Sequence, residues 1–116
     1  MRVGLLVTVL AIAPTLTAAQ QLPAGFPKYE INQRCAAWAP TEDARKVCLS
    51  ENQAGYDAAR AVWSDLSDQT KATCTGLVAR ADRPGAPLPT PYASLADCVF
   101  QFLDTDLTRK QPPFEY

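Results

Sequence analysis

Residues 48–63, "CLSENQAGYDAARAVW", decide the fold class that the 116-residue sequence predicts. Small and apolar residues recur through this stretch and its flanks at the spacing of one helical face. These positions are Val47, Cys48, Gly55, Ala58, Ala59, Val62, Trp63 and Leu66. The chain lacks a useful run in which β-branched and polar residues alternate, the pattern of a half-buried strand. The sequence therefore predicts an all-α protein.

Helix start signals divide the rest of the chain into a few short helices. A short helix is expected before Pro40, and three capping sites follow at Thr41, Ser67-Asp68 and Thr90-Pro91. The last helix carries an apolar stripe made of Tyr92, Leu95, Cys98, Val99, Phe102, Leu103 and Leu107. Residues 82–91, "DRPGAPLPTP", must be a connection because prolines remove backbone donors. We predict three to four short helices in antiparallel hairpins.

The N-terminal residues 1–19 have the layout of a secretory signal peptide. Arg2 precedes an uncharged, mostly apolar run over residues 3–13, and small residues precede Gln20. The alternative is a retained membrane anchor, but the run is shorter than the roughly 20 residues of a spanning helix and Pro14 interrupts it. We expect cleavage before Gln20, a helical domain over 20–107 and a polar tail over 108–116, with no stable membrane anchor after cleavage.

Four cysteines remain in a mature chain bound for an oxidising compartment, which favours two disulfides. They are Cys35, Cys48, Cys74 and Cys98. Zinc is the alternative, but the chain has neither a CxxC pair nor a histidine. The expected compartment is the periplasm or the extracellular space.

The pairing follows from the expected turns, because residues equidistant from a turn face each other in an antiparallel helix pair. Cys35 and Cys48 are centred on residues 40–42, and Cys74 and Cys98 are centred within the proline loop. A Cys48–Cys74 bridge would place the two residues about 15 Å apart. Disulfides tolerate Cα separations only up to about 7 Å. We predict Cys35–Cys48 and Cys74–Cys98.

Composition and motifs argue against catalysis and against nucleic-acid binding. Eleven basic and twelve acidic residues are interspersed, without a basic cluster beyond Arg109-Lys110. The absence of histidine excludes Ser–His–Asp and Cys–His systems, and no phosphate-binding glycine motif occurs. Asp104 and Asp106 would point to different sides of a helix, and Asp65 and Asp68 suit helix caps. We expect neither an enzyme, nor a metal, nor a cofactor.

Glu51 is the first candidate recognition residue. It falls three residues after Cys48 and four before Gly55, so we place it on the inward stripe. It could form a polar recognition patch with Gln53 and Tyr56. The favoured interpretation is structural: Glu51 forms an ion pair with Arg34 or Lys71, or a hydrogen bond with the end of a neighbouring helix.

Two residues of the same helix are expected to have structural roles. Gly55 would let a facing helix approach closely, which explains its unfavourable presence inside a helix. Trp63 is expected to wedge the long helix against its neighbours. The alternative is an exposed tryptophan that stacks on a ligand.

The proline loop is the second candidate binding element. Pro84, Pro87 and Pro89 lie between two helix ends, and the Cys74–Cys98 bridge is expected to anchor its flanks. A loop held in this way loses little entropy on binding. We therefore favour the loop over the tail as the contact surface for a partner.

Residues 48–74, "CLSENQAGYDAARAVWSDLSDQTKATC", and 89–98, "PTPYASLADC", resemble a family of small exported helical proteins of alphaproteobacteria. The positions that carry the resemblance are Cys48, Glu51, Gln53, Trp63, Ser64, Lys71, Cys74, Tyr92, Leu95 and Cys98. They span about half of the mature chain, whereas Cys35 and the long proline loop depart from the pattern. The resemblance implies compartment and fold rather than a chemical activity. A fainter resemblance, through the order Cys, Trp, Cys, Cys, is to helical periplasmic lysozyme inhibitors.

The predicted function is therefore a non-catalytic binding or structural protein of the cell envelope with an extracytoplasmic protein as partner. The alternative is a proteinaceous inhibitor of an extracytoplasmic enzyme, which would present residues 82–91. A third hypothesis is an enzyme that uses carboxylates.

Overall fold

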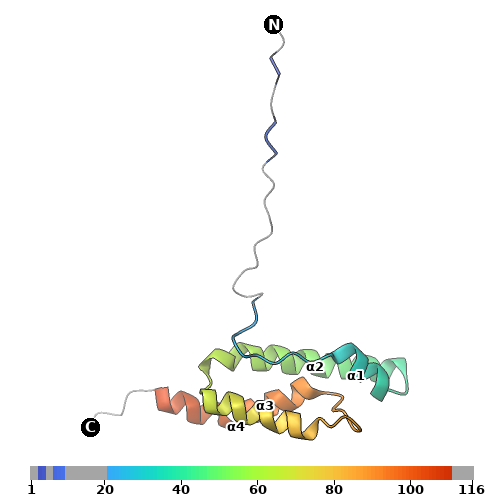
Figure 1. Ribbon diagram of the computed structural model, residues 1–116, viewed down its shortest axis with the longest axis vertical. Helices are drawn as coiled ribbons and strands as arrows, with labels where there is room; N and C mark the ends of the chain where they lie inside the picture. The colour runs from blue at the N-terminus through green and yellow to red at the C-terminus, as the bar shows by residue number, and fades with distance from the viewer. Residues whose placement is uncertain (1–2, 5–6, 10–20, 111–116) are drawn as a thin grey trace, which may run out of the picture.

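The computed structural model describes residues 3–4, 7–9 and 21–110 (Figure 1). Most of the predicted signal peptide and residues 111–116 of the predicted tail lie outside this range. Helices α1 (Ile31–Trp38), α2 (Glu42–Val62), α3 (Asp68–Ala81) and α4 (Pro91–Lys110) make up the domain, with a 3-10 turn η1 (Trp63–Asp65) after α2. The prediction of an all-α fold is confirmed for the described residues, and none of their helices is long and apolar enough to cross a membrane.

The helices form two antiparallel pairs, and α4 holds the two pairs together. Helix α1 packs on α2, whereas α4 packs on both α2 and α3. Helices α2 and α4 run in the same direction, as Figure 1 shows. Each pair contains one disulfide. Cys35–Cys48 joins α1 to α2, and Cys74–Cys98 joins α3 to α4, with Cα separations of 5.7 and 5.6 Å. Both predicted pairings are confirmed.

Two helices begin at the capping residues that the sequence indicates. Thr41 Oγ1 accepts a hydrogen bond from the Ala44 N–H at 3.1 Å, and Ser67 Oγ accepts one from Thr70 at 3.1 Å. Acidic side chains occupy both first turns, where the helix dipole favours them. These local signals need no tertiary contact, which is why the sequence predicts them well.

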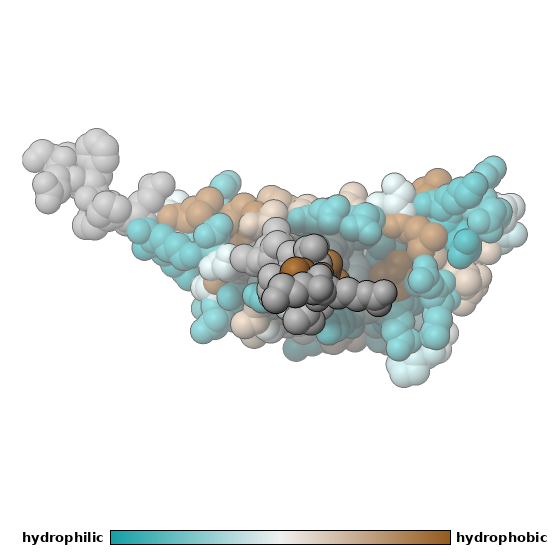
Figure 2. Space-filling view, turned by 90° about the horizontal axis from the view of Figure 1, so that it is seen from above, coloured by the Kyte–Doolittle hydropathy of each residue, from teal (hydrophilic) through white to brown (hydrophobic). Residues whose placement is uncertain are grey.

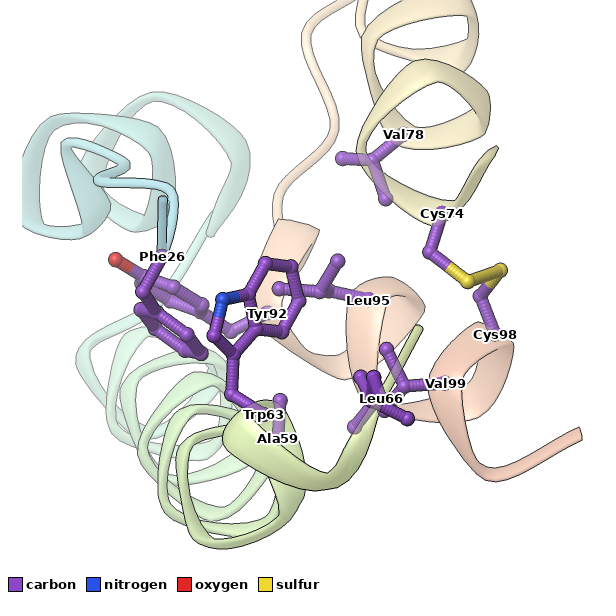
Figure 3. Close-up of a cluster of buried hydrophobic side chains, with 11 residues drawn as sticks. Phe26, Ala59, Trp63, Leu66, Cys74, Val78, Tyr92, Leu95, Cys98 and Val99 are labelled. Atoms are coloured by element: carbon purple, nitrogen blue, oxygen red, sulfur yellow. A yellow bond between two sulfur atoms is a disulfide. The ribbon is translucent and has the colours of Figure 1, made fainter. Parts of the chain in front are cut away.

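The core forms where α2, η1, α3 and α4 meet (Figure 3). Trp63 is 1% exposed and lies against Phe26, with ring centroids 5.1 Å apart. The prediction of a buried Trp63 is therefore confirmed. Phe26 was not anticipated as a core residue. It lies in the segment before α1, and it also contacts the rings of Tyr56 and Tyr92.

The segment before α1 is tied to the core by hydrogen bonds as well as by aromatic packing. Trp63 Nε1 donates to the Ala24 carbonyl at 3.1 Å. The Tyr92 hydroxyl donates to the Pro27 carbonyl at 3.0 Å and accepts from the Tyr29 N–H at 3.1 Å. Burial raises the pKa of the Tyr92 phenol. Residues 24–29 are therefore part of the fold.

Gly55 marks the closest approach of α2 to α4. A Cβ at this position would lie 2.5 Å from the backbone carbon and oxygen of Tyr92. The predicted role of Gly55 is confirmed, because any larger residue would push the two helices apart.

The far end of α4 differs from the prediction. Phe102 and Leu107 are 37% and 40% exposed, whereas Asp106 is 3% exposed. Asp106 accepts a hydrogen bond from the Ser67 N–H at 3.0 Å, and this bond lowers the pKa of the Asp106 carboxyl. Here α4 meets the start of α3, whose backbone donors require an acceptor. A carboxylate is therefore buried where the stripe predicted an apolar end.

Helix α4 continues through residues 108–110, three residues beyond the predicted end of the domain. Thr108 Oγ1 donates to the Asp104 carbonyl at 2.7 Å, and Lys110 Nζ lies 3.9 Å from Asp65 Oδ1. Cations in a last helical turn are favoured by the helix dipole. Asp65 thus pairs with the end of α4.

Candidate functional site: the anchored proline loop

Residues 82–90 connect α3 to α4, and this loop extends beyond the ends of the two helices (Figure 1). The Ala86 N–H donates to the Arg83 carbonyl at 2.9 Å, which closes a β-turn with Pro84 at its second position. Proline is favoured there because its ring fixes the backbone angle that the turn needs. Residues 83–87 are exposed. The loop therefore presents a short turn to solvent.

A side chain from α1 clamps the loop on both sides of the turn. Arg34 donates two hydrogen bonds to the Asp82 carboxylate, at 2.7 and 2.8 Å, and a third to the Leu88 carbonyl at 3.0 Å. Asp82 Oδ1 also accepts from the Leu88 N–H at 2.9 Å. The hydrogen bonds from Arg34 lower the pKa of the Asp82 carboxyl. Both ends of the turn are thus joined through one carboxylate.

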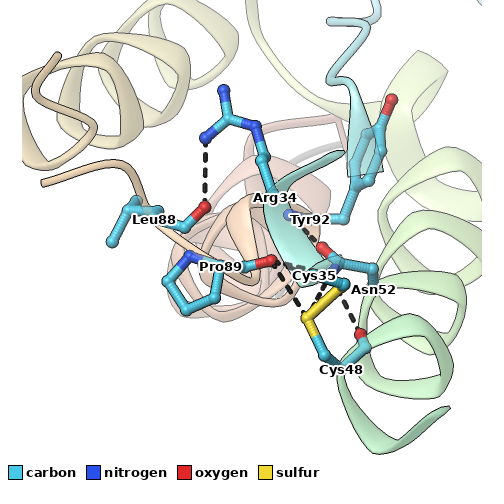
Figure 4. The surroundings of a disulfide bond; sticks show 7 residues. All are labelled: Arg34, Cys35, Cys48, Asn52, Leu88, Pro89 and Tyr92. Atoms are coloured by element: carbon cyan, nitrogen blue, oxygen red, sulfur yellow. Dashed lines mark hydrogen bonds between the residues drawn. A yellow bond between two sulfur atoms is a disulfide. The ribbon is translucent and has the colours of Figure 1, made fainter. Parts of the chain in front are cut away.

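The second half of the loop is held by α2 (Figure 4). Asn52 is 1% exposed, and its Nδ2 donates to the Pro89 carbonyl at 2.9 Å and to the Cys48 carbonyl at 3.0 Å. Its Oδ1 accepts from the Tyr92 N–H at 3.4 Å. An oxygen acceptor at this place satisfies the N–H of the second residue of α4, as an N-cap does. The sequence assigned this role to Thr90, whose carbonyl accepts from Ser94.

The Cys35–Cys48 disulfide supports the same anchor. The Pro89 carbonyl oxygen lies 3.5 Å from Cys48 Sγ, and Asn52 Nδ2 lies 3.5 Å from Cys35 Sγ. Because Arg34 precedes Cys35, the bridge also fixes the part of α1 that carries the clamp. The Cys74–Cys98 bridge links the two helices that flank the loop, and side chains of α1 and α2 provide further anchors.

The three predicted loop prolines have different environments. Pro84 and Pro87 are exposed and available for contact, whereas Pro89 is half-buried and its carbonyl is an anchor point. Asn52 is the residue that the sequence analysis missed. Its position one turn after Cys48, together with the poor helix propensity of asparagine, is the signal that could have identified it.

The structure corrects the placement of Glu51. The inward positions of α2 are Cys48, Asn52, Gly55 and Ala59, and Glu51 is exposed. Successive residues of a helix point in directions about 100° apart. The side chain of Glu51 therefore points away from the core, whereas that of Asn52 points into it.

The two expected ion-pair partners of Glu51 are occupied elsewhere. Arg34 binds Asp82, while Lys71 Nζ lies 4.0 Å from Asp68 and 5.9 Å from the centre of the Trp63 ring. Glu51 therefore forms neither of the two predicted ion pairs.

Gln53 and Tyr56 lie together, as predicted, but without Glu51. They line a hollow of about 300 Å³ between α1 and α2, together with Ile31, Asn32, Leu49, Asn52 and Tyr92. The Gln53 amide donates to Asp57 at 3.0 Å. Figure 2 shows one face of the molecule, on which hydrophilic side chains alternate with smaller hydrophobic areas.

The carboxylates that could be candidates for chemistry have structural partners. Asp82 and Asp106 hold backbone N–H groups, and Asp65 and Asp68 lie beside lysines. Within residues 21–110, no group of three or more His, Cys, Asp or Glu side chains is arranged to hold a metal. The geometry on this part of the chain is that of a stabilised surface loop.

Comparison with known proteins gives no match to a family model, to a curated protein or to a solved structure. The resemblance to exported alphaproteobacterial proteins and to lysozyme inhibitors stays a prediction from the sequence motifs.

Proposed function

We propose that this protein is an exported, non-catalytic binding protein that presents residues 83–87 to another extracytoplasmic protein. Two formed disulfides are typical of proteins in an oxidising environment. The signal-peptide pattern of residues 1–19 and the resemblance to exported proteins support the periplasm or the extracellular space as its location. The interspersed surface charges favour a protein over a nucleic acid as partner.

The observation that carries the proposal is the anchoring of an exposed loop at both ends. Arg34 binds the Asp82 carboxylate before the turn and the Leu88 carbonyl after it. Asn52 binds the Pro89 carbonyl, and the turn residues between these contacts are exposed. A loop that is ordered before binding loses less conformational entropy when a partner immobilises it. A loop whose only role is to connect two helices could be shorter. The length of this loop together with its anchors therefore favours a role in recognition.

The proposal predicts that rigidity and surface chemistry of the loop both contribute to binding. Arg34→Lys keeps the charge but cannot donate the paired hydrogen bonds of a guanidinium. Pro84→Ser with Pro87→Ser changes the exposed surface and keeps the clamp. Arg45→Lys is the matched control, because Arg45 forms an exposed bidentate pair with Glu42 on α2.

The experiment uses the mature protein as bait in extracytoplasmic extract, with a photo-crosslinking residue at position 86. A partner that crosslinks to wild type and to Arg45→Lys, but weakly to the other two variants, supports the proposal. Equal crosslinking to all four proteins, or none at all, contradicts it.

An inhibitor of an extracytoplasmic enzyme is the second candidate, favoured by the projecting shape of the anchored turn. An inhibitor must fill an active-site cleft with a segment that holds its conformation. The test measures lysis by a c-type lysozyme, and hydrolysis by secreted proteases, with increasing amounts of the protein. Inhibition that Pro84→Ser with Pro87→Ser removes would support this candidate, and full enzyme activity at saturating protein would contradict it.

A further inference from the structure

The hollow between α1 and α2 differs chemically from two other hollows in the described residues. Its lining side chains are uncharged: three amides, two tyrosines and two aliphatic residues. By contrast, the hollow of about 300 Å³ between α3 and α4 includes Asp97. The hollow beside Trp63 includes Asp68 and Lys71. A ligand of the first hollow would therefore be selected by shape and neutral hydrogen bonding.

The aromatic part of this hollow is held in place by the core. The Tyr56 ring contacts the Phe26 and Tyr92 rings edge-on, with centroids 5.6 and 5.1 Å apart. The Arg60 guanidinium lies 6.0 Å from the centre of the Tyr56 ring. Leu49 and Ile31 add aliphatic surface beside these rings. The hollow thus has an ordered apolar wall that a flat, apolar ligand face could cover.

Its polar part consists of two accessible amides on opposite walls. Asn32 projects from α1 and Gln53 from α2, and both side chains are exposed. Each amide offers donors and an acceptor, which is the combination that a hydroxyl group can match. The hydrogen bond from Gln53 to Asp57 orients one of them. Asn52, by contrast, is engaged with Cys48, Pro89 and Tyr92 and forms the floor.

We propose that the hollow between α1 and α2 binds a neutral pyranose unit of a saccharide. The carbon-bound hydrogens of one ring face lie against Tyr56, Leu49 and Ile31. The hydroxyls at the ring edge exchange hydrogen bonds with Asn32 and Gln53. A volume of about 300 Å³ is at the lower end for small-molecule sites, which suits a single sugar ring. The proposal does not depend on the loop function, although Asn52 belongs both to the loop anchor and to the floor of the hollow.

The test is a titration of the ¹⁵N-labelled mature protein with glucose and with cellotetraose, followed by heteronuclear NMR. A ligand of about a dozen non-hydrogen atoms with ordinary efficiency has a dissociation constant on the order of 1 mM. We expect saturable shifts at the side-chain amides of Asn32 and Gln53. Tighter binding of cellotetraose than of glucose would identify the ligand as a unit of a glycan chain. Equal affinity for the two would identify it as a free sugar.

Matched alanine variants decide whether the site is the one proposed. Asn32→Ala and Gln53→Ala each remove one accessible amide and should weaken binding about five- to tenfold. Both residues are exposed, so the amide spectrum should retain the dispersion of the folded protein. Gln101→Ala, in the hollow of the same volume between α3 and α4, should leave the affinity unchanged.

Three outcomes overturn the proposal. The first is the absence of saturable shifts at sugar concentrations far above the expected dissociation constant. The second is a set of shifts confined to residues outside the hollow. The third is an affinity that Asn32→Ala and Gln53→Ala leave unchanged. None of them bears on the loop, which the crosslinking experiment tests separately.

Discussion

Replacing Gly55 and Gly76 by alanine should change the stability of the protein in opposite directions, although both glycines lie inside helices. In an unhindered helix interior, alanine is more favourable than glycine by about 1 kcal/mol. Gly76 in α3 has open space where a Cβ would go. Gly76→Ala should therefore raise the free energy of unfolding by about 1 kcal/mol, and the melting temperature by about 4–8 °C.

At Gly55 the same methyl group meets backbone atoms that cannot rotate away. Its Cβ would lie 2.5 Å from the Tyr92 carbonyl and 2.6 Å from the Ala93 nitrogen, so α2 and α4 would have to separate by about 1 Å. Overpacking of this kind costs about 1–3 kcal/mol, occasionally more. The separation also stretches the 3.4 Å hydrogen bond between Asn52 and the Tyr92 N–H, which is worth about 1 kcal/mol.

After subtraction of the helix preference, Gly55→Ala should destabilise the protein by about 1–3 kcal/mol. The melting temperature should fall by about 5 °C or more. The assay is thermal unfolding followed by far-UV circular dichroism, with both disulfides intact in every variant. A Gly55→Ala protein that melts at or above the wild-type temperature, while Gly76→Ala behaves as expected, would refute the close packing of α2 on α4.

Three further changes test the core and the anchors. Trp63→Ala should lower the free energy of unfolding by about 3–5 kcal/mol, measured by urea denaturation; a loss below 1 kcal/mol would contradict its burial. Asn52→Ala leaves the Pro89 carbonyl and the Tyr92 N–H without their partner and should cost about 1–3 kcal/mol in the same assay, whereas Gln53→Ala should cost little. The hydrogen bonds from Arg34 lower the pKa of the Asp82 carboxyl in the folded protein. Their stabilisation is therefore fully present above the ordinary carboxyl pKa near 4, and it is lost as the pH falls through the lower, folded-state pKa. The stability difference between wild type and Asp82→Asn should therefore be present at pH 7 and shrink on acidification, and a difference that is constant with pH would contradict the clamp.

The sequence by itself determined the features that depend on neighbours along the chain. Thr41 and Ser67 begin helices because their hydroxyls bond to backbone groups three residues away. The disulfide pairing followed from the two turns, since the geometry of a helix hairpin leaves few alternatives. The roles of Gly55 and Trp63 were predicted correctly because each stands out from its neighbours in the sequence. Gly55 is a glycine inside a helix, and Trp63 is the largest side chain on the apolar stripe.

Only the tertiary structure decided which polar residues are buried and what they hold. Asn52 and Glu51 are adjacent, and a pattern of small and apolar residues does not fix the helix phase well enough to tell which one faces inward. Asp106 is buried because the backbone N–H of Ser67, at the start of α3, needs an acceptor there. Ser67 lies 39 residues away in the sequence, so no local pattern around Asp106 indicates this contact. Phe26 packs in the core through contacts with rings on α2 and α4, beyond the reach of any local periodicity. The proline loop could be recognised as a loop from its composition, but its anchors are hydrogen bonds between segments that only folding brings together.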